Sequence, residues 1–159
     1  MTDTFASLVT SFFGEQSWPI VEIEAGELFE TAFEGERGVW PCRVHTYEDD
    51  RRLVFISAFA GLVPDELRAV MAEFCNRANF GLAIGNFEID HDGGEVRFRT
   101  SLDAAESPAD IELVRNVIVA NVITFDQYLP GIEAVLAGTA PADAIEDVED
   151  NVEADVTPD

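Results

Sequence analysis

The spacing of the apolar residues changes along this chain, and that change limits the folds open to it. Near the N-terminus they recur every three or four positions from Phe5 to Phe13, as on one face of a helix. Further on they alternate, which predicts extended strands over 20–34, 39–47 and 53–60. Helical spacing returns over 64–78. The sequence therefore predicts helices packed against a sheet.

The clearest local signal is a hairpin between residues 82–90 and 95–102. Asp92 and Gly93 both tolerate the positive φ of a type I′ turn, so we expect the turn to be centred on them. In this register, apolar pairs share one face and an ion pair takes the other. The pairs are Ile89 with Val96, Phe87 with Phe98, and Glu88 with Arg97.

A third helix is predicted after this hairpin, because apolar residues step by three or four from Ile111 to Leu136. Ser107 would cap it, and Pro130 would kink or restart it, since its ring clashes with the preceding turn. Residues 139–159 contain no basic residue and no large apolar cluster. We expect them to form a disordered acidic tail after an α+β domain at residues 1–138.

The expected element order is α-β-β-β-α-β-β-α, an α+β fold with a mainly antiparallel sheet and packed helices. Within it, the strand at 53–60 is apolar on both faces. Such a strand is either central and covered twice, or it carries a contact surface. The second interpretation makes one face of the strand a candidate partner-binding surface. Its residues are Val54, Ile56 and Ala58.

The charge of the chain argues against polyanionic partners. It has 32 acidic residues against nine basic ones, a formal net charge of −23. Binding nucleic acid or an anionic membrane surface requires a positive patch, so we expect neither. No apolar run has the length of a membrane span, and the N-terminus lacks the pattern of a signal peptide. We therefore expect a cytoplasmic protein.

Residues that could carry catalysis or hold a metal are few. The spacing of Cys42, His45, Cys75 and His91 fits no common zinc site, and free cysteines usually behave as small buried hydrophobes. A phosphate-binding glycine loop is absent. We expect no catalytic, metal or cofactor site. Paired carboxylates are invisible in a sequence, so the alternative is a small-molecule binder or carboxylate enzyme with a pocket between the sheet and the third helix.

Several segments resemble the YbjN family over roughly residues 18–138. The resemblance implies a fold like that of the type III secretion chaperones, commonly a homodimer, and a protein-binding role with an unidentified partner. It supplies no catalytic residues. The matching segments are Val63-Pro-Asp-Glu66, Phe74-Cys-Asn-Arg-Ala-Asn79, Gly85-Asn-Phe-Glu-Ile-Asp90, Gly94-Glu-Val-Arg-Phe-Arg-Thr-Ser101 and Asp126-Gln-Tyr-Leu-Pro130.

The polar residues of these segments suit structural roles. Asn79 would end the second helix in the left-handed conformation, and Asn86 would hydrogen-bond backbone at a strand edge. Gly85 would allow a bulge. The alternative is that Asn79, Asn86 and Asp126 together form a polar ligand site.

The acidic surface predicts that salt stabilises this protein. Like charges repel across the folded surface, and the Debye length shrinks from roughly 10 Å at 0.1 M to 3 Å at 1 M salt. A surface rich in acids and free of Lys fits a halophilic host; a genome that prefers Arg to Lys is the other explanation. We expect the thermal unfolding midpoint to rise with KCl concentration. A flat or falling midpoint would contradict the halophilic interpretation.

Overall fold

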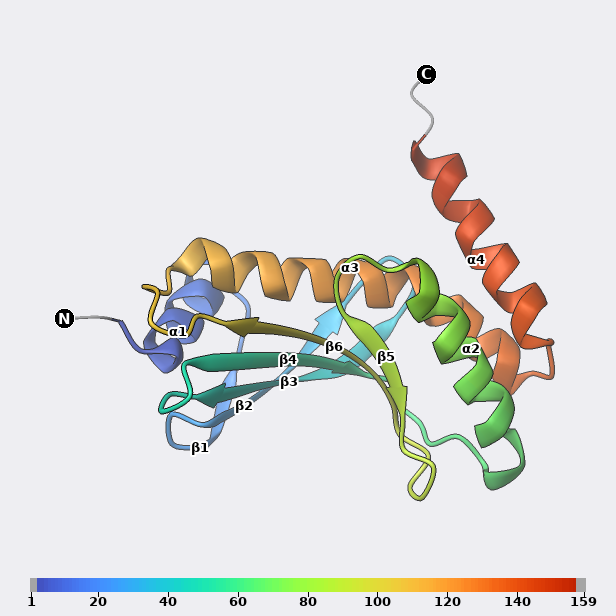
Figure 1. The fold of residues 1–159 in the computed structure, drawn as a ribbon, viewed down its shortest axis with the longest axis horizontal. Coiled ribbons are helices and arrows are strands. Elements are labelled where there is room, and N and C mark those ends of the chain that lie inside the picture. Colours follow the sequence, from blue (N-terminus) through green and yellow to red (C-terminus); the bar gives the residue numbers. More distant parts are fainter. Residues whose placement is uncertain (1–2, 157–159) are drawn as a thin grey trace.

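A six-stranded antiparallel sheet with helices on one face forms the centre of the molecule, so the predicted α+β class is confirmed (Figure 1). The computed structural model describes residues 3–156, and the side chains to residue 151. The strand order is β1-β2-β3-β4-β6-β5. The elements are α1 (Phe5–Glu15), β1 (Val21–Glu24), β2 (Leu28–Glu34), β3 (Val39–Tyr47), β4 (Arg52–Ala58), a 3-10 turn (Asp65–Leu67), α2 (Arg68–Gly81), β5 (Asn86–Ile89), β6 (Val96–Asp103), α3 (Ile111–Leu136) and α4 (Pro141–Val156).

Helix α3 lies along one face of the sheet, with α1 beside its first half and α2 and α4 near its second half (Figure 1). Large aromatic side chains fill the space between α3 and the sheet. Trp40, Phe55, Phe98 and Phe125 are each at most 1% exposed. In the described part of the chain, none of the helices combines the length and the apolar character that a membrane span requires.

Helix α3 begins later than predicted and is not interrupted. Asp110, rather than Ser107, is its N-cap, and the Asp110 carboxylate accepts from the Leu113 N–H at 3.0 Å. Pro130 lies inside a helix that continues to Leu136. The predicted restart at Pro130 is therefore wrong: burial of Leu129 and Ile132 on the inner face of α3 holds the helix together through the proline.

The predicted pairing of the β5–β6 hairpin is confirmed, with Phe87 opposite Phe98 and Glu88 opposite Arg97. The turn itself differs from the predicted type I′ geometry, because the positive φ of 83° is at Gly94. Arg68 supplies the reason. Its guanidinium donates to the carbonyls of His91 and Asp92 at 3.0 and 2.8 Å, which stabilises a longer loop.

Two segments differ from the structure predicted for them. The segment 20–34 forms two strands, β1 and β2, joined by a turn in which Gly26 has a φ of 68°. The disordered tail predicted at 139–159 is wrong for residues 141–156, which form helix α4. Ala144, Ile145 and Val148 are buried there, in contact with surfaces of α2 and α3 that sequence spacing does not reveal. Residues 157–159 lie outside the described part of the chain.

The β2–β3 hairpin is fastened to α3 by Asp126. This mostly buried carboxylate accepts from the backbone N–H groups of Glu36 and Arg37 at 3.3 and 2.9 Å. The Arg37 guanidinium lies 3.3 Å away and offsets its charge. Gly35 makes the close approach possible, because a Cβ there would overlap Asp126 Oδ1. Asp126 thereby places the second half of β2 against α3.

We expect Gly35→Ala to destabilise the fold by about 1–3 kcal/mol, the usual cost of forcing extra volume into a packed site. Gly14→Ala is the matched control, since a Cβ at Gly14 meets nothing within 4 Å and Ala favours helix α1. Urea unfolding would measure both. Equal stabilities for the two variants would contradict the contact between Gly35 and Asp126.

Candidate functional site

The two edges of the sheet differ in whether another strand could join them. At β5, the Asn79 side chain donates to Phe87 O at 3.0 Å and accepts from the Phe87 N–H at 2.6 Å. One amide thus satisfies the backbone groups that an added strand would use. From the sequence we expect Asn79 to end α2 and Asn86 to bond backbone at a strand edge. Helix α2 instead continues to Gly81, and Asn79 makes the hydrogen bonds at the strand edge.

The opposite edge is only half covered. Strand β1 pairs with β2 from Leu28 to Glu30. The rest of β2, Thr31–Glu34, pairs with β3 on its inner side and has no strand on its outer side in the described structure. The Trp18 indole N–H donates to Ala32 O at 2.8 Å. The Thr31 hydroxyl donates to Pro19 O at 2.6 Å. Beyond these contacts the edge is open toward Glu34.

A groove of about 520 Å³ runs between this part of β2 and helix α3. A second hollow continues it toward the β2–β3 hairpin and shares Phe33, Glu34, Val122 and Ile123 with it. Val119 and Ile123 are 39% and 60% exposed on the α3 side. The apolar side chains along the groove are Phe12, Trp18, Phe33, Val119, Val122 and Ile123.

The α3 wall of this groove is almost free of charge. From Asn116 to Ile132 the only charged residue is Asp126, which is buried against the hairpin. Elsewhere the surface carries most of the 32 acidic residues. Covering an uncharged apolar surface removes no ionised group from water, so burying this face carries no cost of desolvating a charge.

An aromatic row forms the base of the groove. The ring centroid of Trp18 lies 4.5 Å from that of Phe13 and 5.2 Å from that of Phe33. Phe33 in turn lies 5.3 Å from Trp40, which is buried under α3. Tilted ring contacts of this kind restrict side-chain movement. The base of the groove is therefore continuous with the aromatic core of the fold.

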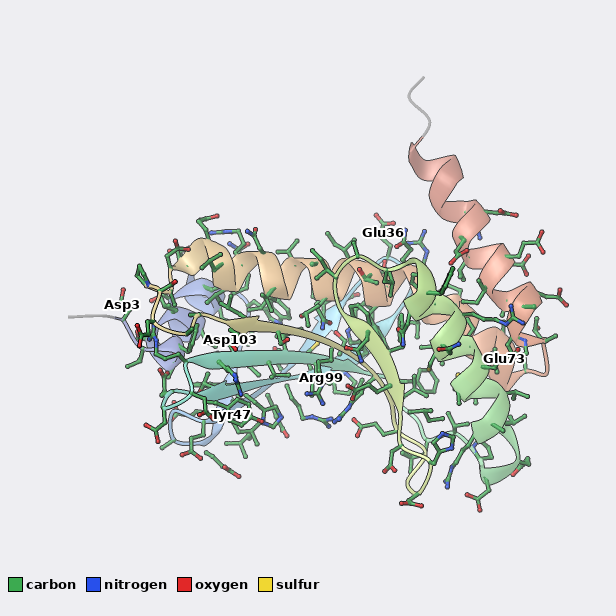
Figure 2. All side chains as sticks on the ribbon, in the orientation of Figure 1. Asp3, Glu36, Tyr47, Glu73, Arg99 and Asp103 are labelled. Atoms are coloured by element: carbon green, nitrogen blue, oxygen red, sulfur yellow. The ribbon has the colours of Figure 1, made fainter. Side chains whose placement is uncertain are left out.

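The candidate residues Val54, Ile56 and Ala58 lie together on the other face of the sheet, which no described helix covers (Figure 1). Ile56 and Ala58 are only 3% and 4% exposed, and Val54 is half-buried. Arginines surround them. Arg43 and Arg99 are opposite Ile56 on the neighbouring strands, and Figure 2 shows Arg99 on the side of the sheet away from α3.

Ion pairs span this open face. Glu88 lies 2.7 Å from Arg97 and 2.8 Å from Arg99, and Arg43 lies 2.6 Å from Glu95. Burial opposes ionisation of Glu88, yet hydrogen bonds from Arg97, Asn86 and Arg99 hold its pKa below the usual value. Burial, then the nearby arginines, lower the pKa of His45. The arginine stems and ion pairs cover the apolar centre of this face.

The other candidates for chemistry have structural surroundings. Burial raises the pKa of both Cys42 and Cys75 to about 12, so neither is a ready nucleophile. Among the side chains that the structure describes, those of residues 3–151, no group of three or more His, Cys, Asp or Glu is placed to hold a metal ion. Asn86 donates to Glu88 at 3.2 Å, whereas Asn79 and Asp126 bond backbone groups of different hairpins. The three polar residues do not form one site.

The groove was not identified from the sequence. Its α3 wall left a signal, namely the 116–132 stretch with one charged residue in a chain where 26% of residues are charged. Its β2 wall left none, because the free half of the strand results from how far β1 pairs. The three-or-four spacing that predicted α3 does not include Ile123, which is 60% exposed.

Comparisons with known proteins agree with this fold. The model of the YbjN family, described as a putative bacterial sensory transduction regulator, matches residues 6–134. No curated protein sequence matches the chain. The crystal structure of YbjN, a putative transcription regulator from E. coli, is similar at 10% identity and a TM-score of 0.59, covering 83% of this chain and 94% of that one.

Two solved complexes also contain similar chains. The ExsC–ExsE complex matches at 15% identity and a TM-score of 0.51, over 77% of this chain and 90% of that one. The HopA1–SchA chaperone–effector complex matches at 12% identity and a TM-score of 0.49, over 77% and 90%. At these identities the likeness to ExsC–ExsE and to YbjN concerns the fold, and the chaperone-like fold expected from the sequence is confirmed.

Replacing Asn79 with Ala should open the β5 edge. The change leaves the N–H and C=O of Phe87 without their side-chain partner, at a cost of about 1–3 kcal/mol in unfolding free energy. Asn76→Ala is the control, because Asn76 is exposed on the same helix. Hydrogen exchange of the Phe87 amide should accelerate only in Asn79→Ala; protection that persists in this variant would contradict the assigned role.

Proposed function

We propose, from the premise that this chain belongs to the YbjN family, that it is a non-enzymatic, chaperone- or adaptor-like module that binds another protein. The observation that carries the proposal is the apolar, nearly uncharged groove between β2 and α3. A preformed apolar groove beside a free strand edge suits an extended polypeptide. The ExsC–ExsE structure is a complex of two proteins, one of which has a similar fold.

The packing of the interior favours a protein partner over a small molecule. The aromatic side chains under α3 occupy the space in which an enclosed ligand pocket would lie. Beside these side chains lies an open groove whose exposed residue Ile123 resembles an interface position. This is the reason to prefer a binding module over the alternative of a small-molecule binder or carboxylate enzyme.

The open face of the sheet is a second proposed contact surface, with Val54, Ile56 and Ala58 at its centre. A partner there would meet the ion-paired arginines before it met Ile56. We further propose a homodimer that acts in the cytoplasm, without nucleic acid or membrane partners. Phe80, 97% exposed at the end of α2, is an apolar contact available to such a dimer, and the net charge of −23 opposes polyanionic partners.

The test compares Ile123→Asp with Leu62→Asp, which place the same charge on side chains that are 60% and 69% exposed. Both variants should keep the unfolding midpoint of the unmodified chain. Crosslinking mass spectrometry in native lysate at native salt should recover the same partners with Leu62→Asp. Ile123→Asp should recover them at least about tenfold less, since a charge then has to be buried against the partner. Equal recovery with both variants would contradict a role for the groove.

A further inference from the structure

The backbone of β2 shows how a partner segment could join it. In an antiparallel sheet, successive residues direct their N–H and C=O groups alternately to the two neighbouring strands. The Gly35 N–H donates toward β3, to Gly38 O at 2.8 Å. Ala32 O faces the opposite way, because it accepts from the Trp18 indole. Glu34 lies two residues after Ala32, so its backbone N–H and C=O also point outward, at the open edge of the sheet.

Trp18 sets the position at which an added strand could begin. Its indole occupies Ala32 O, and Pro19 O accepts from the Thr31 hydroxyl. These contacts cover the edge as far as Ala32. The next outward-pointing residue is Glu34, whose backbone faces no strand within the described residues. A partner segment would therefore hydrogen-bond at Glu34 and lie over Phe33.

The side chains of β2 indicate the chemistry of such a segment. Phe33 faces α3 and lines the groove. Glu34 also borders the groove, and the alternation of the strand directs its side chain to the other face of β2. A strand beside β2 would alternate in the same way, with one set of side chains over Phe33 and Ile123 and the other set beside Glu34. The first set has to be apolar, and the second is favoured when it is basic.

The charges at the hairpin end of the groove also favour a basic partner segment. The Glu36 side chain is 89% exposed, and Figure 2 places it beside α3. The Arg37 guanidinium lies 3.3 Å from Asp126 and 3.9 Å from Glu36. One positive charge therefore faces three carboxylates, those of Glu34, Glu36 and Asp126. Glu34 and Glu36 therefore leave this end negative, in a molecule of net charge −23. Such a field attracts basic segments and repels acidic ones.

We propose that the groove between β2 and α3 binds an extended segment of a partner protein in which apolar and basic side chains alternate, added as a further strand at Glu34. This inference rests on the proposed function, because it specifies the partner for the same groove. A second copy of this chain is a poorer occupant, since its own edge strand carries Glu at 30 and 34 and would repel the same residues.

The probes are blocked octapeptides with four Arg and four Val, titrated into the full chain at about 0.15 M KCl. In one peptide the two residues alternate; in the other all Arg precede all Val; in a third, Glu replaces each Arg of the alternating peptide. We expect the alternating Arg peptide to bind at least about tenfold tighter than the other two and to slow exchange of the Glu34 amide. Equal affinity of the two Arg peptides would overturn the proposal, because charge alone would then explain binding.

Protein variants separate strand addition from simple groove binding. Glu34→Pro and Glu34→Ala both remove the carboxylate, but only Pro removes the outward N–H, a position at which an edge strand tolerates proline. We expect Glu34→Pro to bind the alternating peptide about tenfold more weakly than Glu34→Ala. Exchange of the Glu34 amide in the unmodified chain tests the same bond without a variant.

The remaining outcomes are also decisive. If Ile123→Asp weakens peptide binding while Glu34→Pro equals Glu34→Ala, strand addition is overturned and the groove function stands. If neither Ile123→Asp nor Glu34→Pro weakens it, the peptide binds elsewhere and the strand proposal is overturned, whereas partner recovery with Ile123→Asp decides the groove function separately. Light scattering on the chain alone tests the other occupant: self-association that Glu34→Pro abolishes would assign the edge to a second copy and overturn the proposal.

Discussion

Everything in this structure depends on the contact between helix α3 and the sheet. Phe125 packs with its ring centroid 4.8 Å from that of Trp40, and the Asn121 amide donates to the carbonyls of Phe55 and Phe98 at 3.0 and 3.1 Å. Asp126 then fastens the β2–β3 hairpin to the same helix. The buried side of α3 therefore holds the core together, and the flank of the helix toward β2 forms a wall of the groove. Stability and the proposed function share one element.

The α3 wall of the groove is nearly uncharged in an otherwise acidic molecule, and this makes it a suitable contact surface. A surface with a net charge of −23 repels itself and most acidic partners, so an uncharged helix face is where a close contact costs least. The two edges of the sheet also differ in how far their backbone groups are satisfied. Asn79 satisfies the edge at β5, whereas Trp18 covers the edge at β2 only as far as Ala32. The free edge and the uncharged wall meet at Glu34 and Ile123.

Predictions from the sequence were most accurate where the signal was periodic and local. The pairing of Phe87 with Phe98 follows from alternation alone, and the structure has it. Predictions failed where distant groups intervene. Arg68 reshapes the hairpin loop, and α2 and α3 provide the surface on which Ile145 packs as part of α4. Val54 illustrates the same limit: two apolar faces of a strand fit either a central strand or a contact surface, and they do not show that arginines cover one face.

The sequence by itself determined the α+β class, the family resemblance and the acidity of the surface, because each depends on residue type and on spacing along the chain. Only the tertiary structure decided that α4 is a helix and which sheet edge is open. It also decided that Ile123 is exposed beside Phe33. The physical reason is that burial and strand pairing are properties of two surfaces in contact, and a linear pattern describes only one of the two.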